Sequence, residues 1–272
     1  MRRTAVHGRL AAAGLLLAGL LSSACDVNLG EGGFHVGPLL GRASDQWTKS
    51  YPIGPSGRFE LKNVNGQITV EASPEATSIE VTAERRARAG SDEAARELLK
   101  KIEIVETVQP DRVVLETRAP KSWGREGHEV KYLVKVPPTI QVSARTTNGG
   151  VHVKGLKSQV VASTVNGGVS GEALSGQVEA TTTNGGVEIS LDALAPEGVK
   201  LETVNGGVQL SLPRTAKADI SARVVNGGLD TGGLPIETVG EQNRRRLEGK
   251  MNGGGSRVEL AAVNGGIHLA AQ

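Results

Sequence analysis

Apolar and polar residues alternate through the C-terminal half of the chain, in a unit marked by the triplet Asn-Gly-Gly. Apolar or small residues stand six, four and two residues before the Asn and three residues after it, and the positions between them are mostly polar. This alternation is typical of strands with one buried face. The marking residues are Asn148, Asn166, Asn184, Asn205, Asn226 and Asn264, with a degenerate Asn-Gly-Gln copy at Asn65. Each unit therefore predicts a strand, a corner and a second strand.

Two all-β architectures fit this pattern. Asn-Gly between alternating strands is typical of a hairpin, which would give an antiparallel β-meander or sandwich. The alternative is a parallel β-solenoid, in which each Asn-Gly-Gly is a corner and successive coils stack. The second Gly favours the solenoid, because a two-residue hairpin turn does not need it and it would weaken the returning strand.

Two further features favour the solenoid. Each Asn shares the parity of the inward residues before it, so stacked Asn side chains could hydrogen-bond along the corner. In consecutive units Glu179 and Lys200 occupy one slot, and Glu202 and Arg223 another. Parallel in-register stacking would place these opposite charges side by side. We expect the solenoid.

One further triplet, at Asn252, does not fit the pattern. Arg246, Glu248 and Lys250 stand six, four and two residues before it, and such charged residues cannot line an apolar interior. We expect residues 231–257 to leave the stack, and the last coil to resume at Val258. The repeat region as a whole is predicted over 141–272.

Residues 51–140 differ from the repeats in their sequence pattern. They predict a β-rich capping region. Strands are expected at 58–62, 67–71, 78–83, 102–108, 112–117 and 129–136. Residues 91–101 predict one short helix, with Ser91 as N-cap, acidic residues in its first turn and lysines in its last. A cap is expected because the open end of a solenoid exposes unpaired strand groups.

The N-terminus has the pattern of a secretory signal. Basic residues precede an apolar run over 10–21, and small residues then lead to Cys25, the only cysteine in the chain. Residues 21–25, Leu-Ser-Ser-Ala-Cys, resemble a bacterial lipobox, although Ser22 stands where Leu is usual. The resemblance implies that residues 1–24 are removed and that Cys25 is lipidated and anchors the chain to a membrane. The Gly-rich residues 25–50 predict a flexible tether.

Composition narrows the function further. Removing residues 1–24 takes away three of the 31 basic residues and none of the 29 acidic ones, so no excess positive charge points to nucleic acid. The five histidines lack metal spacing, and the corners lack nucleotide and calcium fingerprints. No aromatic residue follows Tyr132, which argues against sugar or base stacking along the repeats. Trp123 is expected on a loop, and we interpret it as a partly buried side chain that anchors this loop. We predict no catalytic residues, metal or cofactor.

The repeated segments resemble a known bacterial family. The motifs LETVNGGVQLSLP and STVNGGVSGEALSG, and RRLEG before the last repeat, are similar to a β-strand-repeat family of unknown function labelled "putative adhesin", over about residues 50–272. Its members usually carry Asn-Gly-Asp or Asn-Gly-Ser at the corner. The resemblance implies a right-handed β-solenoid and brings no catalytic residues.

The functional prediction is a non-enzymatic, lipid-anchored protein of the bacterial cell envelope. Its solenoid would serve as a binding, adhesin-like or structural surface for an envelope protein or glycan. One alternative is a sensory or regulatory partner of envelope-stress machinery. Another is a polysaccharide-acting β-helix enzyme, which would need a groove with carboxylates, Arg or Lys, and aromatic residues.

Overall fold

The computed structural model describes residues 40–121, 126–239 and 243–272. The predicted signal peptide, Cys25 and the tether up to residue 39 lie outside the described residues, as does Trp123. Residues 40–272 form one compact unit. The described residues of this unit form strands and one helix, so the all-β prediction is confirmed.

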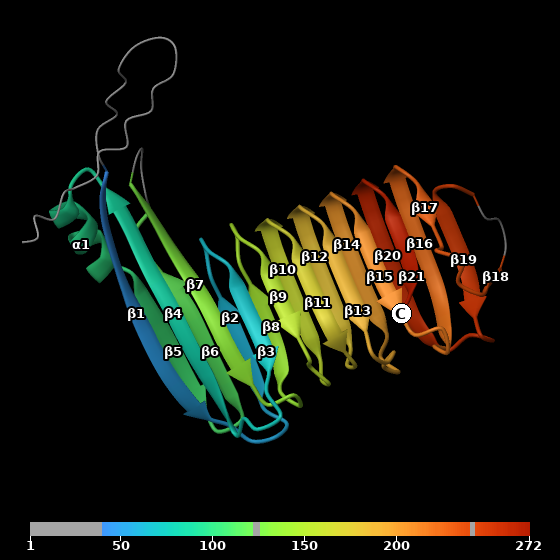
Figure 1. Cartoon of the computed structure of the whole chain (residues 1–272), viewed down its shortest axis with the longest axis horizontal. Coiled ribbons are helices and arrows are strands. Elements are labelled where there is room, and N and C mark those ends of the chain that lie inside the picture. The colour runs from blue at the N-terminus through green and yellow to red at the C-terminus, as the bar shows by residue number, and fades with distance from the viewer. Residues whose placement is uncertain (1–39, 122–125, 240–242) are drawn as a thin grey trace, which may run out of the picture. The chain divides into compact units, whose positions relative to one another are not determined.

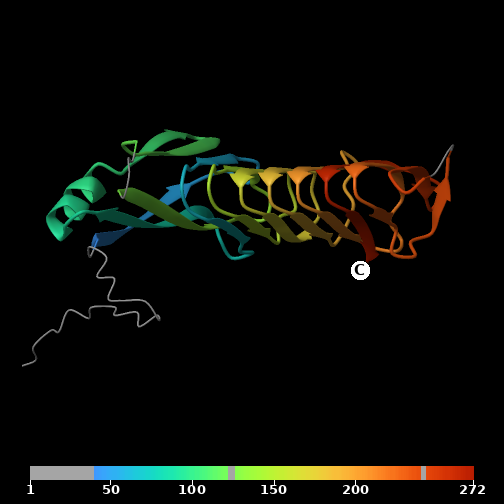
Figure 2. The ribbon, with the colours of Figure 1, turned by 90° about the horizontal axis from the view of Figure 1, so that it is seen from above.

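The strands form two sheets that lie over one another (Figures 1 and 2). Sheet A has ten strands, in the spatial order β1 (Gly41–Pro52), β4 (Ser78–Ala89), β7 (Gly127–Val136), β3 (Ile68–Ala72), β9 (Val151–Lys154), β11 (Val169–Leu174), β13 (Val187–Leu191), β15 (Val208–Leu212), β21 (Ile267–Ala271) and β17 (Leu229–Asp230). Sheet B has eleven, in the order β18 (Ile236–Thr238), β19 (Arg246–Met251), β16 (Ala218–Asn226), β20 (Ser256–Asn264), β14 (Val199–Asn205), β12 (Val178–Asn184), β10 (Val160–Asn166), β8 (Gln141–Arg145), β2 (Arg58–Lys62), β6 (Arg112–Arg118) and β5 (Glu103–Gln109).

Each repeat contributes one strand to sheet B, a corner, and one strand to sheet A. Neighbouring repeats pair in parallel and in register, so Val187 lies beside Val208, and Glu179 beside Lys200. Thr203 pairs with Thr182 and Ala262 of other repeats rather than across its own corner. The solenoid-like parallel stack is therefore confirmed, and the antiparallel meander is wrong for the repeats.

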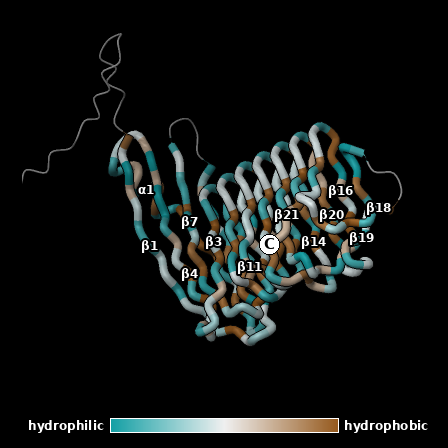
Figure 3. The backbone as a smooth tube through the Cα atoms, turned by 45° about the vertical axis from the view of Figure 1, so that its right-hand side comes forward, coloured by the Kyte–Doolittle hydropathy of each residue, from teal (hydrophilic) through white to brown (hydrophobic). Residues whose placement is uncertain are grey.

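The core lies between the sheets and consists of the residues with inward parity. Val208 and Leu210 are 1% and 0% exposed, whereas Gln209 between them is exposed. Figure 3 shows the resulting alternation of hydrophobic and hydrophilic positions along the strands. Valine, leucine and alanine fill the repeats, while the larger Tyr51, Phe59 and Tyr132 lie at the N-terminal end. The interior of the repeats is therefore narrow, as the small β-branched residues predict.

The N-terminal end of the stack is built from long antiparallel strands. β1 pairs with β4, and β4 with β7, and helix α1 (Asp92–Lys100) packs against β1 and β4. The Ser91 side chain accepts a hydrogen bond from the Ala94 N–H at the start of that helix. The expected tether is wrong for residues 41–50, because they form most of β1. The sequence did not predict this strand because most of its side chains are polar and lie exposed, without a clear apolar alternation.

The last coil is not the last in space. Strand β20 lies between β14 and β16, and β21 lies between β15 and β17, so the C-terminal coil is inserted one place before the end of the stack. As a result Glu202 and Arg223 are not neighbours, because Ala261 separates them. The predicted contact between these two residues is wrong for that reason.

Strands β18 and β19, which lie within the predicted excursion at 231–257, form the C-terminal end of sheet B. Strand β19 pairs antiparallel with β16, and β18 pairs antiparallel with β19. Asn252 has a φ of 51°, and its Nδ2 donates to the carbonyls of Arg214 and Ala216, each at 2.8 Å. It therefore belongs to a local turn. The segment leaves the parallel stack, although β20 begins at Ser256, two residues before the predicted return.

Candidate binding surface

The corners carry a continuous row of asparagine side chains. The Nδ2 of each donates to the Oδ1 of its neighbour on the N-terminal side of the stack at 2.7–2.9 Å, always in the same direction. The spatial order is Asn65, Asn148, Asn166, Asn184, Asn205, Asn264 and Asn226. At its beginning, Asn65 Nδ2 lies 3.3 Å from His128 Nε2. Aligned amides polarise one another, so this ladder holds the coils in register.

The first glycine of each corner is required by the backbone. At these seven glycines φ lies between 126° and 155°, a range that L side chains rarely adopt. An added Cβ would also lie 1.9–2.4 Å from a carbonyl oxygen of the neighbouring coil or strand. No side chain fits there. The residues are Gly66, Gly149, Gly167, Gly185, Gly206, Gly227 and Gly265.

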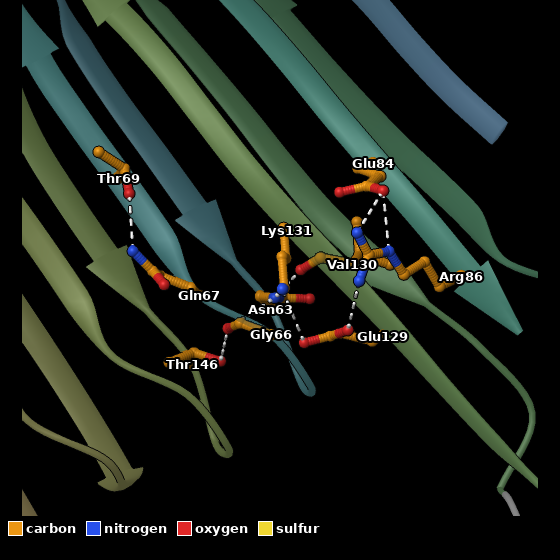
Figure 4. Close-up of polar contacts among 10 residues, drawn as sticks. All are labelled: Asn63, Gly66, Gln67, Thr69, Glu84, Arg86, Glu129, Val130, Lys131 and Thr146. Carbon is orange, nitrogen blue, oxygen red and sulfur yellow. Dashed lines mark hydrogen bonds and ion pairs between the residues drawn. The ribbon is translucent and has the colours of Figure 1, made fainter. Parts of the chain in front are cut away.

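Buried threonines bind the same carbonyls from inside. The Thr182 hydroxyl donates to the carbonyl of Gly167 at 2.8 Å, and Thr164 and Thr203 make the equivalent bond one coil away. In the first coil Asn63 takes this place, and its Nδ2 donates to the carbonyls of Gly66 and Val130 (Figure 4). These bonds satisfy polar atoms that the corner would otherwise bury unpaired.

The second glycine of each corner is not required by the backbone. None of the six has a positive φ. A Cβ would meet a neighbouring carbonyl oxygen at 3.3–3.5 Å at five of them, and nothing within 4 Å at Gly228. At Gly150 it would also meet the end of the His152 side chain, at 3.0 Å. The six are Gly150, Gly168, Gly186, Gly207, Gly228 and Gly266. Side chains would fit at most of these places, and the chain has none.

Five of these six glycines line a groove on the outer face of sheet A, with a volume of about 700 Å³. A row of polar residues lies beside them, four positions after each Asn: His152, Ser170, Glu188, Gln209, His268 and Asp230. Six coils contribute to it, so at about 4.8 Å per coil the groove extends roughly 25 Å along the stack. Its surface is bare backbone flanked by hydrogen-bonding side chains.

Two pairs within the polar row touch. His152 Nδ1 is hydrogen-bonded to Ser170 Oγ, and His268 Nδ1 lies 3.0 Å from Asp230 Oδ2. The N–H of Gly232, followed by His268, lowers the pKa of Asp230, so this carboxylate stays charged. Both histidines are tied to neighbours, and the arrangement offers hydrogen-bonding and charged groups to a ligand. We find no triad geometry in it, since neither acid of the row, Glu188 or Asp230, forms a hydrogen bond with His152, the histidine that contacts the serine.

The structure places the other candidate residues elsewhere. Among the described residues, no three His, Cys, Asp or Glu side chains gather as metal ligands would. In the same part of the chain, no helix has the length and apolar character needed to cross a membrane. Arg246, from the basic run at 244–246, forms an ion pair with Glu248 on β19. Sequence reasoning missed the groove, although the superfluous second glycine was its signal.

A family model for Toastrack DUF4097 matches residues 55–270 of the chain. The chain belongs to the Toastrack DUF4097 family. This confirms the predicted membership of a repeat family of unknown function. No curated protein sequence matches this Toastrack chain.

The chain also has similarity to solved structures of bacterial proteins. A putative cell adhesion protein from Clostridium sporogenes has 15% identity and a TM-score of 0.48, with 85% of this chain and 100% of that one covered. A putative adhesin from Bacteroides fragilis has 13% identity and a TM-score of 0.39, with 83% and 97% covered.

Proposed function

We propose that this protein is a non-enzymatic, lipid-anchored protein of the bacterial cell envelope that binds an extended partner in the glycine-lined groove. The right-handed coil implied by the family resemblance is part of the same proposal. The observation that carries the binding role is the second glycine row. A side chain is compatible with the backbone and with most of the surroundings there, so the repeated absence of one keeps the groove open.

The groove favours a partner that lies flat along several coils. Glycine lets a ligand approach the backbone closely, and the polar row supplies both donors and acceptors along one side. Neither aromatic platforms nor a catalytic carboxylate pair accompanies it in the described residues. Recognition would therefore come from shape and hydrogen bonding. The proposed partner is an envelope glycan or an extended segment of an envelope protein.

Filling the groove tests the proposal. The full chain carrying Gly186→Phe would be compared with the wild type for binding to isolated cell envelopes of the producing bacterium, measured by sedimentation. Thr181→Phe, in the same coil but on the outer face of sheet B, is the matched control. We expect Gly186→Phe to weaken binding at least tenfold while Thr181→Phe does not. Equal binding by all three proteins at equal thermal stability would refute a binding role for the groove.

The anchor is tested separately. Replacing Cys25 with Ala should move the protein from the membrane fraction to the soluble fraction, because the acylation site is lost. Mass spectrometry of the mature wild-type N-terminus should show an acylated Cys25. An unmodified N-terminus elsewhere would remove the anchor from the proposal without affecting the groove.

A further inference from the structure

A second surface, on the outer face of sheet B, carries several positively charged side chains. Strands β2, β8 and β10 lie side by side near the N-terminal end of the stack (Figure 1). They enclose a depression of about 360 Å³, whose charged lining residues are Arg58, Glu60, Lys62 and Arg145, with Ser143 beside them. The glycine groove lies on the other sheet, so the two surfaces are independent.

Lys62 and Arg145 are direct register partners on the neighbouring parallel strands β2 and β8. Their backbones are therefore about 4.8 Å apart, and both side chains are exposed on the same face. Like charges placed directly opposite one another destabilise a sheet. Within the described residues, neither side chain forms an ion pair.

The nearby acidic residues do not neutralise this pair. Glu60 is bound by Arg112 at 2.8 Å, and Glu116, the register neighbour of Lys62 on β6, is bound by Arg118 at 3.2 Å. At the other end of the depression, Gln141 Oε1 accepts hydrogen bonds from the Arg58 guanidinium at 3.0 and 3.2 Å. The depression therefore holds three cationic side chains and one carboxylate, Glu60, which is already paired with Arg112 outside the depression.

Some cations elsewhere on the repeats have acidic partners. Lys154 pairs with Glu172, Lys200 with Glu202, and Arg257 with Glu259. Lys62 and Arg145 have no such ion pair among the described residues, so the two neighbouring cations repel one another. An anionic ligand bound between the two side chains would be attracted by both and would offset their repulsion.

We propose that Lys62 and Arg145 bind a tetrahedral oxyanion of the phosphate class. Lysine offers a compact charge and arginine a planar fork, and both suit phosphate oxygens. Ser143, two residues before Arg145 on the same face, supplies a hydroxyl donor. The anion is either a free phosphate group, a phosphodiester within a polymer, or a lipid headgroup, since all three present the same oxygens.

The first test uses the purified full chain and inorganic phosphate, with sodium chloride at equal ionic strength as reference. We expect phosphate to raise the unfolding temperature of the wild type and Lys62→Gln to weaken phosphate binding at least tenfold. Lys62→Gln should also unfold at a higher temperature than the wild type without phosphate, because the like-charge contact is gone. A merely structural lysine would not produce these two opposite effects.

Lys200→Gln is the matched control, since it removes a paired cation from the same face. It should keep the phosphate response. An equal loss in Lys200→Gln, or no loss in Lys62→Gln, would overturn the proposal in favour of diffuse screening. Sedimentation with phosphatidylglycerol vesicles and with poly(glycerol phosphate) then separates the sources. Lys62-dependent binding to the vesicles indicates a headgroup, to the polymer indicates a phosphodiester, and to neither indicates the free ion.

Discussion

The two glycines of each corner are adjacent in sequence but differ in what they do. At the first row, exemplified by Gly185, φ is 153° and an added Cβ would lie 2.0 Å from the Gly167 carbonyl oxygen. At the second row, exemplified by Gly186, φ is not positive and a Cβ would lie 3.5 Å from the nearest oxygen. The first glycine is explained by folding, whereas the second is not. This contrast separates the residues that build the solenoid from those available to a ligand.

The largest expected effect concerns the first row. Gly185→Ala should lower the free energy of unfolding by about 4 kcal/mol or more, because strained backbone and overlap with a neighbouring coil combine. Gly186→Ala, one residue away, should change it by less than about 0.5 kcal/mol. Urea denaturation of the two variants measures both values. Similar losses would mean that both glycines are structural and that the groove has no separate purpose.

The next effect extends the comparison to the strand that follows. Val208→Asp would bury an unpaired carboxylate between the sheets and should cost about 3 kcal/mol. Gln209→Asp places the same group in the exposed polar row and should cost less than about 0.5 kcal/mol. The unfolding midpoints of the two variants in urea measure both losses of stability. If both variants lost the same stability, the assignment of inner and outer faces would be wrong.

A smaller effect is expected from the threonines that support the first row. Thr182→Val leaves the Gly167 carbonyl without the hydroxyl that donates to it, which should cost about 1–2 kcal/mol. Valine fits this position in principle, since Val224 occupies it in another repeat and is 3% exposed. Thr181→Val, on the outer face, is the control and should be close to neutral. A neutral Thr182→Val would show that water or another donor replaces the hydroxyl.

The smallest effect should appear at the beginning of the asparagine ladder. Burial lowers the pKa of His128 from its ordinary value of 6.5. The unfolded chain therefore binds this proton more readily than the folded one, and stability should fall as the pH drops below about 6.5. His128→Gln can accept the same hydrogen bond from Asn65 without titrating. Its melting temperature should decline less between pH 7 and pH 5 than that of the wild type; parallel declines would assign the acid sensitivity elsewhere.

Sequence pattern alone determined which residues face inward. Val187, Val208 and Ile267 follow the second glycine at the same distance and lie beside one another in the core. The order of the coils could not be predicted in this way. Val258, Leu260 and Ala262 have the same pattern as Ile220, Ala222 and Val224, so either set could pair with β14. The pairing of β19 with β16 distinguishes them, and it depends on contacts that the repeat does not encode.

The candidate sites were less predictable than the core. The outward row that includes His152 and Asp230 was visible as a pattern, but its neighbours depended on the coil order, so the contact between His268 and Asp230 could not be foreseen. Lys62 and Arg145 are 83 residues apart in sequence, and only the register of β2 with β8 brings them together. Their like charges carry no local sequence signal. The repeat pattern therefore predicts which side chains face inward and which face outward, but not which residues of different coils lie side by side.

The inserted C-terminal coil has a consequence for how the molecule is completed during synthesis. The place between β14 and β16 can be filled only by β20, whose Leu260 meets Leu201 across 59 residues of chain. Contacts of such sequence separation form slowly, because a long loop must close first. A chain that stops before Ser256 would leave two facing strand edges with nothing between them. Residues 256–271 therefore join the coils on either side of them, and a chain without these residues cannot form the continuous stack.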